Sequence, residues 1–190
     1  RTLEGIWREL MSGSFRLERP LRIAYLGPPG SFSHQAALRH FGSSTELEDT
    51  RGISAVVEEV QADRADYGMV PYENAIGGSI TETLDSLQEH RCPVCAETLI
   101  AIDQTLMANC PPEQIETIIS RPEAISQCST WLSTHYPTAE IIESFSTSAA
   151  VEIARDEANT AAIGCRLAGE LSGLKVLFDR IQDRAENVTR

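Results

Sequence analysis

Apolar and polar positions along this chain alternate between two patterns. Short apolar runs predict strands at 21–26, 46–49, 67–70, 115–119, 140–143 and 160–163, with extended segments at 98–102, 105–108 and 176–181. Longer stretches with apolar side chains at helical spacing predict helices at 2–15, 31–41, 53–62, 79–87, 122–135, 147–156 and 165–171. This order of strands and helices is typical of α/β proteins with mostly parallel sheets.

The first predicted helix carries an apolar stripe that has nothing local to pack against. The stripe consists of Leu3, Ile6, Trp7, Leu10 and Met11. We expect this helix to be the tail of a preceding domain or to pack on a partner.

Two later segments, Cys92–Pro93 and Val176–Leu177, suit crossovers between two lobes. We expect lobe 1 to comprise 20–98 and 178–190, and lobe 2 to comprise 99–177. A cleft between two such α/β lobes would bring several strand ends around one ligand.

Composition narrows the classes of partner. The chain has 190 residues and a formal net charge of -12, which argues against nucleic acid or an anionic membrane surface as a partner. No apolar run reaches membrane-spanning length. An anionic ligand would therefore have to be held by local donors, namely arginines and helix N-termini.

The five cysteines cannot all pair within the chain, and this favours a reducing cytoplasm. Cys92 and Cys95 form a C-x-x-C motif, but no second pair of zinc ligands accompanies it. We therefore expect inert thiols and no metal site.

The segment 70–79 carries the most informative polar residues. Glu73 and Asn74 follow the short run 67–70, which we expect to be a buried strand, and they precede the predicted helix at 79–87. The loop after a strand is where open α/β sheets place ligand-binding groups. An ordinary turn with polar surface residues is the alternative interpretation.

Three further loops join a predicted strand to a predicted helix and carry small polar side chains. Their candidate residues are Ser31, Ser33, Ser120, Gln127, Glu143, Thr147 and Ser148. A helix start offers unpaired backbone N–H groups to an anion, although plain helix capping also explains such serines and threonines. The final segment 187–190 contains Asn-x-Thr, which would be a glycosylation acceptor only in a secreted protein, and the alternative interpretation is a frayed polar tail. Spacing alone thus predicts a two-lobed α/β protein that binds a small anionic molecule.

Four segments, taken in chain order, resemble the prephenate dehydratase family. They are Gly30–Ser33, Val70–Asn74, Ser120–Cys128 and Asn187–Arg190, and the similarity extends from Leu21 to Arg190. The resemblance implies a two-lobed fold like that of type 2 periplasmic binding proteins, with the active site in the interlobe cleft. It also implies a hydro-lyase without a cofactor, which converts prephenate to phenylpyruvate, carbon dioxide and water on the route to phenylalanine.

The resemblance also implies roles for individual residues. By position, the catalytic candidates are Thr189, Asn74, Gln127, Ser120 and Glu73, and the substrate-binding candidates are Arg190, Ser31, Ser33, Thr147, Ser148 and Glu143. We expect Thr189 to donate a hydrogen bond to the departing oxygen. Glu73 is an alternative proton source if it is buried enough to stay protonated.

The segments 6–14 and 19–22 resemble the last helix of a chorismate mutase domain joined to a dehydratase. We therefore expect 1–19 to be a mutase remnant or linker in a bifunctional protein that forms a homodimer or higher oligomer. The family's ACT domain, which binds L-phenylalanine, is expected to lie outside this chain.

The chain departs from the family pattern at three places. Arg121 replaces a usual histidine, Gln104 lies near a position where histidine is common, and the chain stops at Arg190 where the family continues with phenylalanine. Two other function classes remain open: a non-catalytic module that binds small anions, and a mutase-linked or regulatory fragment whose first helix bridges subunits.

Overall fold

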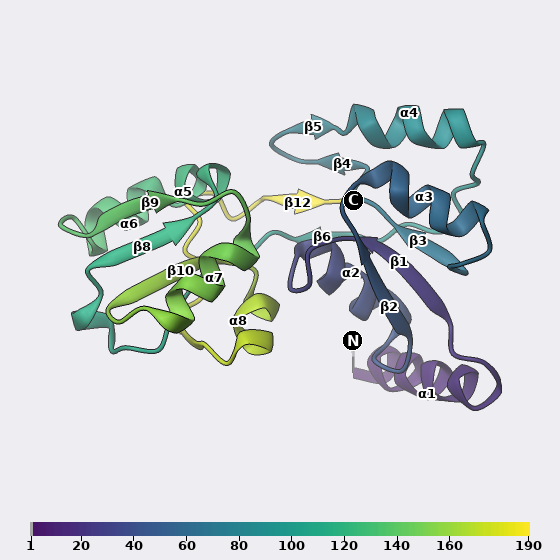
Figure 1. Ribbon diagram of the computed structural model, residues 1–190, viewed down its shortest axis with the longest axis horizontal. Coiled ribbons are helices and arrows are strands. Elements are labelled where there is room, and N and C mark those ends of the chain that lie inside the picture. Colours follow the sequence, from purple (N-terminus) through teal and green to yellow (C-terminus); the bar gives the residue numbers. More distant parts are fainter. Residues whose placement is uncertain (1) are drawn as a thin grey trace. The chain divides into compact units, whose positions relative to one another are not determined.

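The computed structural model describes residues 2–190 and divides the chain into two compact units (Figure 1). Unit 1 comprises the chain up to Pro28, Phe32–Ile100 and Val188–Arg190, and unit 2 comprises Pro29–Ser31 and Ala101–Asn187. Residues 178–187, which we expected in the first lobe, therefore belong to unit 2. Their partners explain this, because Ile181 N donates to the carbonyl of Gln104 within that unit.

Unit 1 is built around a three-stranded parallel sheet in the order β2-β1-β3. Its elements are α1 (Thr2–Glu18), β1 (Arg22–Leu26), α2 (Phe32–Phe41), β2 (Glu46–Thr50), α3 (Ile53–Gln61), β3 (Tyr67–Met69) and α4 (Thr81–His90). The central strand β1 alternates its side chains, so Ile23 packs with Ala37 of α2 and Ala24 packs with Val56 of α3. The prediction that 67–70 is a buried strand was wrong, because β3 is an edge strand with Tyr67 exposed.

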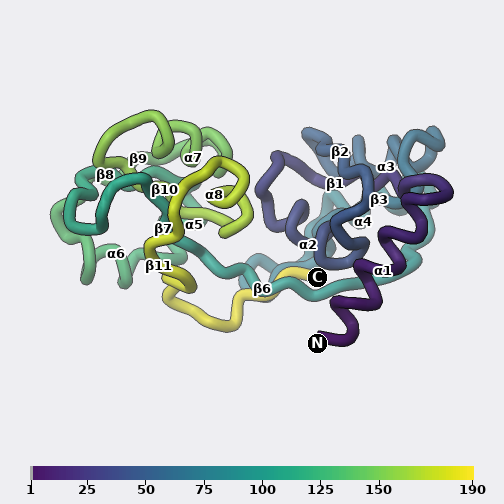
Figure 2. The backbone as a smooth tube through the Cα atoms, turned by 90° about the horizontal axis from the view of Figure 1, so that it is seen from below, coloured from purple at the N-terminus to yellow at the C-terminus, as the bar shows by residue number. Residues whose placement is uncertain are grey.

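A second sheet, formed mainly by unit 1, includes residues 73–79, where a loop was expected. It contains β4 (Glu73–Asn74), β5 (Gly78–Ser79), β6 (Ile100–Ala101) and β12 (Val188–Thr189), in the order β5-β4-β12-β6. Glu73 and Asn74 thus lie in a β-hairpin rather than in a strand-to-helix loop, and α4 begins at Thr81 instead of Ser79. The chain end is not a frayed tail, since β12 pairs antiparallel with β4 and lies beside β6 (Figure 2).

Unit 2 contains a five-stranded mixed sheet in the order β11-β7-β10-β8-β9. Its elements are β7 (Thr105–Ala108), a 3-10 turn (Pro112–Gln114), β8 (Thr117–Ser120), α5 (Pro122–Gln127), α6 (Ser129–His135), β9 (Glu140–Glu143), α7 (Thr147–Asp156), β10 (Thr160–Gly164), α8 (Arg166–Ser172) and β11 (Lys175–Phe178). Strand β7 runs antiparallel to both of its neighbours, whereas β8, β9 and β10 are parallel. The expectation of mostly parallel strands therefore holds for the second half of this sheet and fails at β7.

The single helix predicted at 122–135 is divided into α5 and α6 at Cys128, whose ψ of 11° departs from helical geometry. The carboxylate of Asp183 accepts hydrogen bonds from the backbone N–H groups of Thr130 and Trp131, at 2.9 and 3.1 Å, and so caps the start of α6. Desolvation opposes the effect of these bonds, but together they hold the pKa of Asp183 below its ordinary value. The break depends on a residue far along the chain, which helical periodicity does not reveal.

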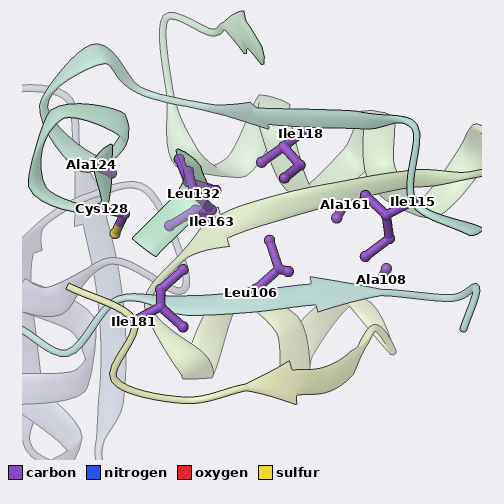
Figure 3. Packing of buried hydrophobic residues seen from close by; sticks show 10 residues of the cluster. All are labelled: Leu106, Ala108, Ile115, Ile118, Ala124, Cys128, Leu132, Ala161, Ile163 and Ile181. Atoms are coloured by element: carbon purple, nitrogen blue, oxygen red, sulfur yellow. The ribbon is translucent and has the colours of Figure 1, made fainter. Parts of the chain in front are cut away.

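The core of unit 2 lies on both faces of its sheet. One face packs against α5, α6 and the segment after β11, through a cluster drawn in Figure 3: Leu106, Ala108, Ile115, Ile118, Ala124, Cys128, Leu132, Ala161, Ile163 and Ile181. The other face packs Met107, Ile119 and Ala162 against the helices α7 and α8. Buried strands held from both sides fix the positions of the polar residues at their ends.

Candidate active site

In unit 1, the side chains of Asn74 and Thr189 meet across the β4–β12 pair. Their Cα atoms are register partners, and Nδ2 of Asn74 donates a hydrogen bond of 2.8 Å to Oγ1 of Thr189. Backbone bonds hold the two strands together, since Arg190 N donates to Glu73 O and Tyr72 N donates to Arg190 O, each at 2.8 Å. Residues more than one hundred positions apart are thereby placed in direct contact.

The polarity of this pair is fixed by the turn that follows β4. Oδ1 of Asn74 accepts hydrogen bonds from Ile76 N and Gly77 N, both at 2.9 Å, so the amide nitrogen has to face Thr189. Thr189 Oγ1 is therefore the acceptor in its bond with Asn74. No acceptor among residues 2–190 takes the hydroxyl hydrogen of Thr189, so this hydrogen is available to a ligand.

Arg190 lies beside two carboxylates rather than in a free anion site. Its guanidinium group is 3.9 Å from Glu73 Oε2 and 3.6 Å from Glu97 Oε2, and its side chain is 43% exposed. Loose ion pairs at this exposure contribute about 0–1 kcal/mol, so a ligand carboxylate can compete for the guanidinium. Glu73 is itself 46% exposed, and the burial that would make it a proton source is not found.

In unit 2, Gln127 at the end of α5 contacts Gln104. Nε2 of Gln104 donates to Oε1 of Gln127 at 3.0 Å, and Gln104 is only 4% exposed. The backbone of Gln104 is held as well, because its N–H donates to Oε1 of Gln182 at 2.9 Å. Gln182 in turn donates to Asp103 at 2.9 Å. Gln104 stood out in the sequence only as a departure from the family pattern, and no signal there linked it to Gln127 or Gln182.

Ser120 and Gln127 were both expected to be catalytic residues, but their hydrogen bonds differ. Ser120 is 0% exposed at the end of β8, and its hydroxyl donates to the carbonyl of Ile163 at 2.7 Å. Arg121, which follows Ser120, is exposed and forms a 3.3 Å ion pair with Glu123. Ser120 therefore has a structural bond that fixes the β8 end, whereas Gln127 keeps its amide nitrogen without a hydrogen bond to any residue from 2 to 190.

The start of α7 is a capped helix N-terminus. Ser146 is the cap residue, and its hydroxyl accepts a hydrogen bond from Ala149 N at 3.0 Å. Thr147 and Ser148 occupy the first turn, and Ser148 Oγ lies 3.1 Å from Ser146 Oγ. Glu143 ends strand β9 and is exposed. The first-turn N–H groups and hydroxyls of this helix are suited to an anion.

At α2, Ser31 precedes the helix and Ser33 lies in its first turn. The ring of His34 stacks on Tyr25 with centroids 4.7 Å apart. Burial lowers the pKa of His34 although Asp49 opposes the shift, and burial together with the charge of Asp49 raises the pKa of Tyr25 to about 12. Both rings therefore favour their neutral forms at neutral pH.

The remaining chemistry-bearing residues do not assemble into a metal site. Among residues 2–190, no group of three or more His, Cys, Asp or Glu side chains is arranged to hold a metal ion. Cys92, Cys95, Cys110, Cys128 and Cys165 are all free thiols. In the same range, no helix is both long enough and apolar enough to span a membrane.

The fold and these residues define an α/β protein whose two units each carry candidate hydroxyl and amide groups at strand ends and helix starts, with a guanidinium group in unit 1. The family model for prephenate dehydratase matches residues 23–190, and the chain belongs to the prephenate dehydratase family.

Relatives and solved structures support this assignment. A bifunctional chorismate mutase/prephenate dehydratase from Stutzerimonas stutzeri is 40% identical over 187 residues, which cover 97% of this chain and 51% of the relative. A prephenate dehydratase from Lactococcus lactis subsp. lactis is 35% identical, covering 90% of this chain and 62% of that protein. The structure of prephenate dehydratase from Arthrobacter aurescens, in complex with L-Phe, matches with a TM-score of 0.79 and 30% identity, covering 89% of this chain and 58% of that one. This chain thus spans about half the length of its bifunctional relatives.

Proposed function

We propose that this chain catalyses the decarboxylative dehydration of prephenate to phenylpyruvate. The observation that carries the proposal is the Asn74–Thr189 pair, in which a threonine hydroxyl accepts from a fixed amide and keeps its own hydrogen for a ligand. Accepting an N–H bond polarises the O–H bond and makes it a better donor. Such a donor suits a reaction in which an oxygen leaves with negative charge.

The chemistry of prephenate defines what the protein has to supply. The ring carboxylate leaves as carbon dioxide, and its bonding electron pair moves into the ring as the C–O bond to the ring hydroxyl breaks. The departing hydroxide takes up one proton and becomes water. The ring becomes aromatic, so the barrier lies in expelling a poor leaving group, and a hydrogen bond from Thr189 to that oxygen would lower it.

The substrate also carries two carboxylates, which need donors in a protein with a net charge of -12. We assign this binding to Arg190, to the amide nitrogen of Gln127 and to the helix starts that hold Ser31 and Ser33 and Thr147 and Ser148. Glu73 then acts by orienting Arg190, and Glu143, at the exposed end of β9, contributes to substrate binding. Ser120 acts as a positioning residue, because its hydroxyl is already bonded to a backbone carbonyl.

The direct test replaces the hydroxyl of Thr189 without changing the volume of the side chain. Thr189→Val removes the hydrogen bond to the leaving oxygen and should lower kcat roughly 10- to 150-fold, the usual value of one hydrogen bond to a charged group, whereas Thr189→Ser should retain most of the activity. Formation of phenylpyruvate is followed by its ultraviolet absorbance in base. Thr134→Val, at an exposed position on α6, is the matched control. If Thr189→Val turns over prephenate at the wild-type rate, the donor assignment is wrong.

The same assay decides between the enzyme and a non-catalytic module that binds small anions. A binding module would show saturable binding of prephenate without release of phenylpyruvate. An enzyme releases phenylpyruvate in proportion to protein concentration and time.

We further propose that α1 belongs, in the whole protein, to a chorismate mutase domain that also joins subunits of a homodimer or higher oligomer. The polar side of α1 is bound to unit 1, because Glu9 accepts from Ser43 Oγ at 2.6 Å and Ser12 Oγ accepts from Ser44 N at 3.1 Å. The opposite side exposes large apolar side chains: Leu3, Ile6, Trp7, Leu10 and Met11. An amphipathic helix whose apolar side faces solvent supports the proposal that this side is covered by another surface in the whole protein.

Two measurements test this second proposal. The mass of the chain in solution is compared before and after removal of residues 1–19, and an unchanged mass would contradict a role of α1 in assembly. Chorismate mutase activity is measured on a longer form of the protein.

We propose a cytoplasmic location and prephenate as the partner molecule, with no nucleic acid or membrane partner. We also propose that L-phenylalanine acts only through an ACT domain outside this chain, so it should not inhibit residues 1–190.

A further inference from the structure

We propose that Gln104 is a positioning residue that holds the amide of Gln127 with its N–H groups turned outward, as donors to a substrate carboxylate. This inference rests on the function proposed above and adds a residue to its site. Gln104 does not itself need to touch the substrate. Its hydrogen bond to Gln127 determines whether the free end of the Gln127 amide presents N–H donors or a carbonyl acceptor.

The backbone of Gln104 is fixed by hydrogen bonds, which limits how its side-chain amide can reorient beside Gln127. Gln104 is buried at the start of the segment that leads into β7, and both of its backbone polar groups are engaged. Its N–H donates to Gln182 Oε1 at 2.9 Å, and its carbonyl accepts from Ile181 N at 3.0 Å. Gln182 is itself fixed by its 2.9 Å bond to Asp103. The backbone that carries the Gln104 side chain is thus held by a hydrogen bond at both its N–H and its carbonyl group.

Gln127 is equally well placed. Its carbonyl accepts from Asp183 N at 2.7 Å, and it ends α5 immediately before the break at Cys128. Its Oε1 accepts from Nε2 of Gln104 at 3.0 Å, while Oε1 of Gln104 is buried without a partner among residues 2–190. Only the amide nitrogen of Gln127 remains for an outside group.

The orientation of the pair follows from the burial of Gln104. Turning both amides over would place the Gln104 carbonyl against the Gln127 nitrogen and leave the N–H groups of Gln104 buried without an acceptor. Unpaired buried N–H groups are rarer in proteins than unpaired carbonyl oxygens, so the orientation with Gln104 as donor is favoured. It presents the N–H groups of Gln127, which match a carboxylate and not a hydroxyl hydrogen.

Three substitutions at Gln104 separate this role from packing. Gln104→Met removes the donor together with the unpaired oxygen, so thermal stability should be maintained while kcat/KM falls about tenfold. Gln104→Glu replaces the donor by an acceptor, turns the Gln127 amide over and should lower kcat/KM about 100-fold. Gln104→His restores an N–H donor and should recover activity to within about threefold of wild type. Gln114→Glu, on the exposed 3-10 turn, controls for an added negative charge.

Binding and spectroscopy distinguish failure of this inference from failure of the proposed function. Prephenate affinity is measured by calorimetry in the Thr189→Val background, where weaker binding by the Met and Glu variants is expected. The side-chain ¹⁵N amide signal of Gln127 should exchange rapidly with solvent in the wild type and become protected in Gln104→Glu. If the wild type neither binds nor converts prephenate, the proposed function fails, and the ¹⁵N signal alone decides the orientation. Unchanged amide protection in Gln104→Glu, or activities that follow thermal stability regardless of donor or acceptor, would overturn the inference.

Discussion

Substituting Asn74 by aspartate tests the polarity of the Thr189 hydroxyl with the smallest available change in shape. Oδ1 still accepts from Ile76 N and Gly77 N, so the β4–β5 hairpin should persist and the melting temperature should change little. The group facing Thr189, however, becomes an acceptor in place of the donor that now lies 2.8 Å away. Thr189 then donates its hydroxyl hydrogen to the new carboxylate and can no longer donate it to the leaving oxygen.

The magnitude follows from the value of one hydrogen bond to a charged group. Such a bond contributes about 1.5–3 kcal/mol, which corresponds to a roughly 10- to 150-fold fall in kcat. The new negative charge also lies in the strand next to Arg190, so KM for a dianionic substrate should rise as well.

Steady-state kinetics on prephenate and thermal unfolding are measured for Asn74→Asp and for Asn109→Asp, an exposed asparagine in unit 2 that serves as the control. The expected result is a large loss of kcat at nearly unchanged stability for Asn74→Asp only. Wild-type kcat in Asn74→Asp would refute the argument that the amide orients the threonine. A collapse of stability would refute the expectation that the bonds from Ile76 N and Gly77 N to Oδ1 persist in the variant.

Three further predictions concern unit 2. Asp183→Ala should lower the free energy of unfolding by about 1 kcal/mol at neutral pH, since it removes the cap of α6. Because the folded-state pKa of Asp183 is lowered, this stabilisation is present above the ordinary carboxyl pKa of about 4 and is lost as the pH falls through the folded-state pKa. The free energies of unfolding of variant and wild type, measured by denaturant titration, should therefore converge in acid. A difference that stays constant with pH would contradict the cap. Burial, reinforced by the charge of Asp183, raises the pKa of Cys128 to about 12, so iodoacetamide near pH 8 should label exposed Cys95 and leave Cys128 unmodified until the protein unfolds, as read by mass spectrometry. Gly164→Ala would place a methyl group against Cγ2 of Thr147 and should lower the free energy of unfolding by about 1–3 kcal/mol. It should also raise KM with little change in kcat, and a normal KM would contradict a role of this helix start in binding.

The hydrogen bonds of the candidate site join distant parts of the sequence. Asn74 contacts Thr189, Gln104 contacts Gln127, and Gln182 contacts Gln104, in each case through a side chain that bonds to a separate segment of the chain. The functional polarity of each amide is therefore a property of the assembled sheets. Substitutions elsewhere that shift a strand register should alter it without touching these residues.

The sequence by itself determined the local elements of this protein and the family to which it belongs. Helix 147–156 has the predicted bounds, and most predicted strands lie within two residues of their observed positions, because apolar periodicity is set by which face of an element is buried. The segments around Asn74, Gln127 and Thr189 resembled the family by their residue types in linear order, and the family model matches residues 23–190.

Only the tertiary structure decided how these segments are used. The β4–β12 pair, the break at Cys128 and the assignment of 178–187 to unit 2 all depend on partners remote in the chain. Ser120 was expected to be a catalytic residue but is fully buried, and Gln104 was noted in the sequence only as a departure from the family pattern but contacts Gln127. The physical reason is that helical and strand propensities act over a few residues, whereas the choice of hydrogen-bond partner for a buried polar group is made by whichever chain segment the packed sheet brings within about 3 Å.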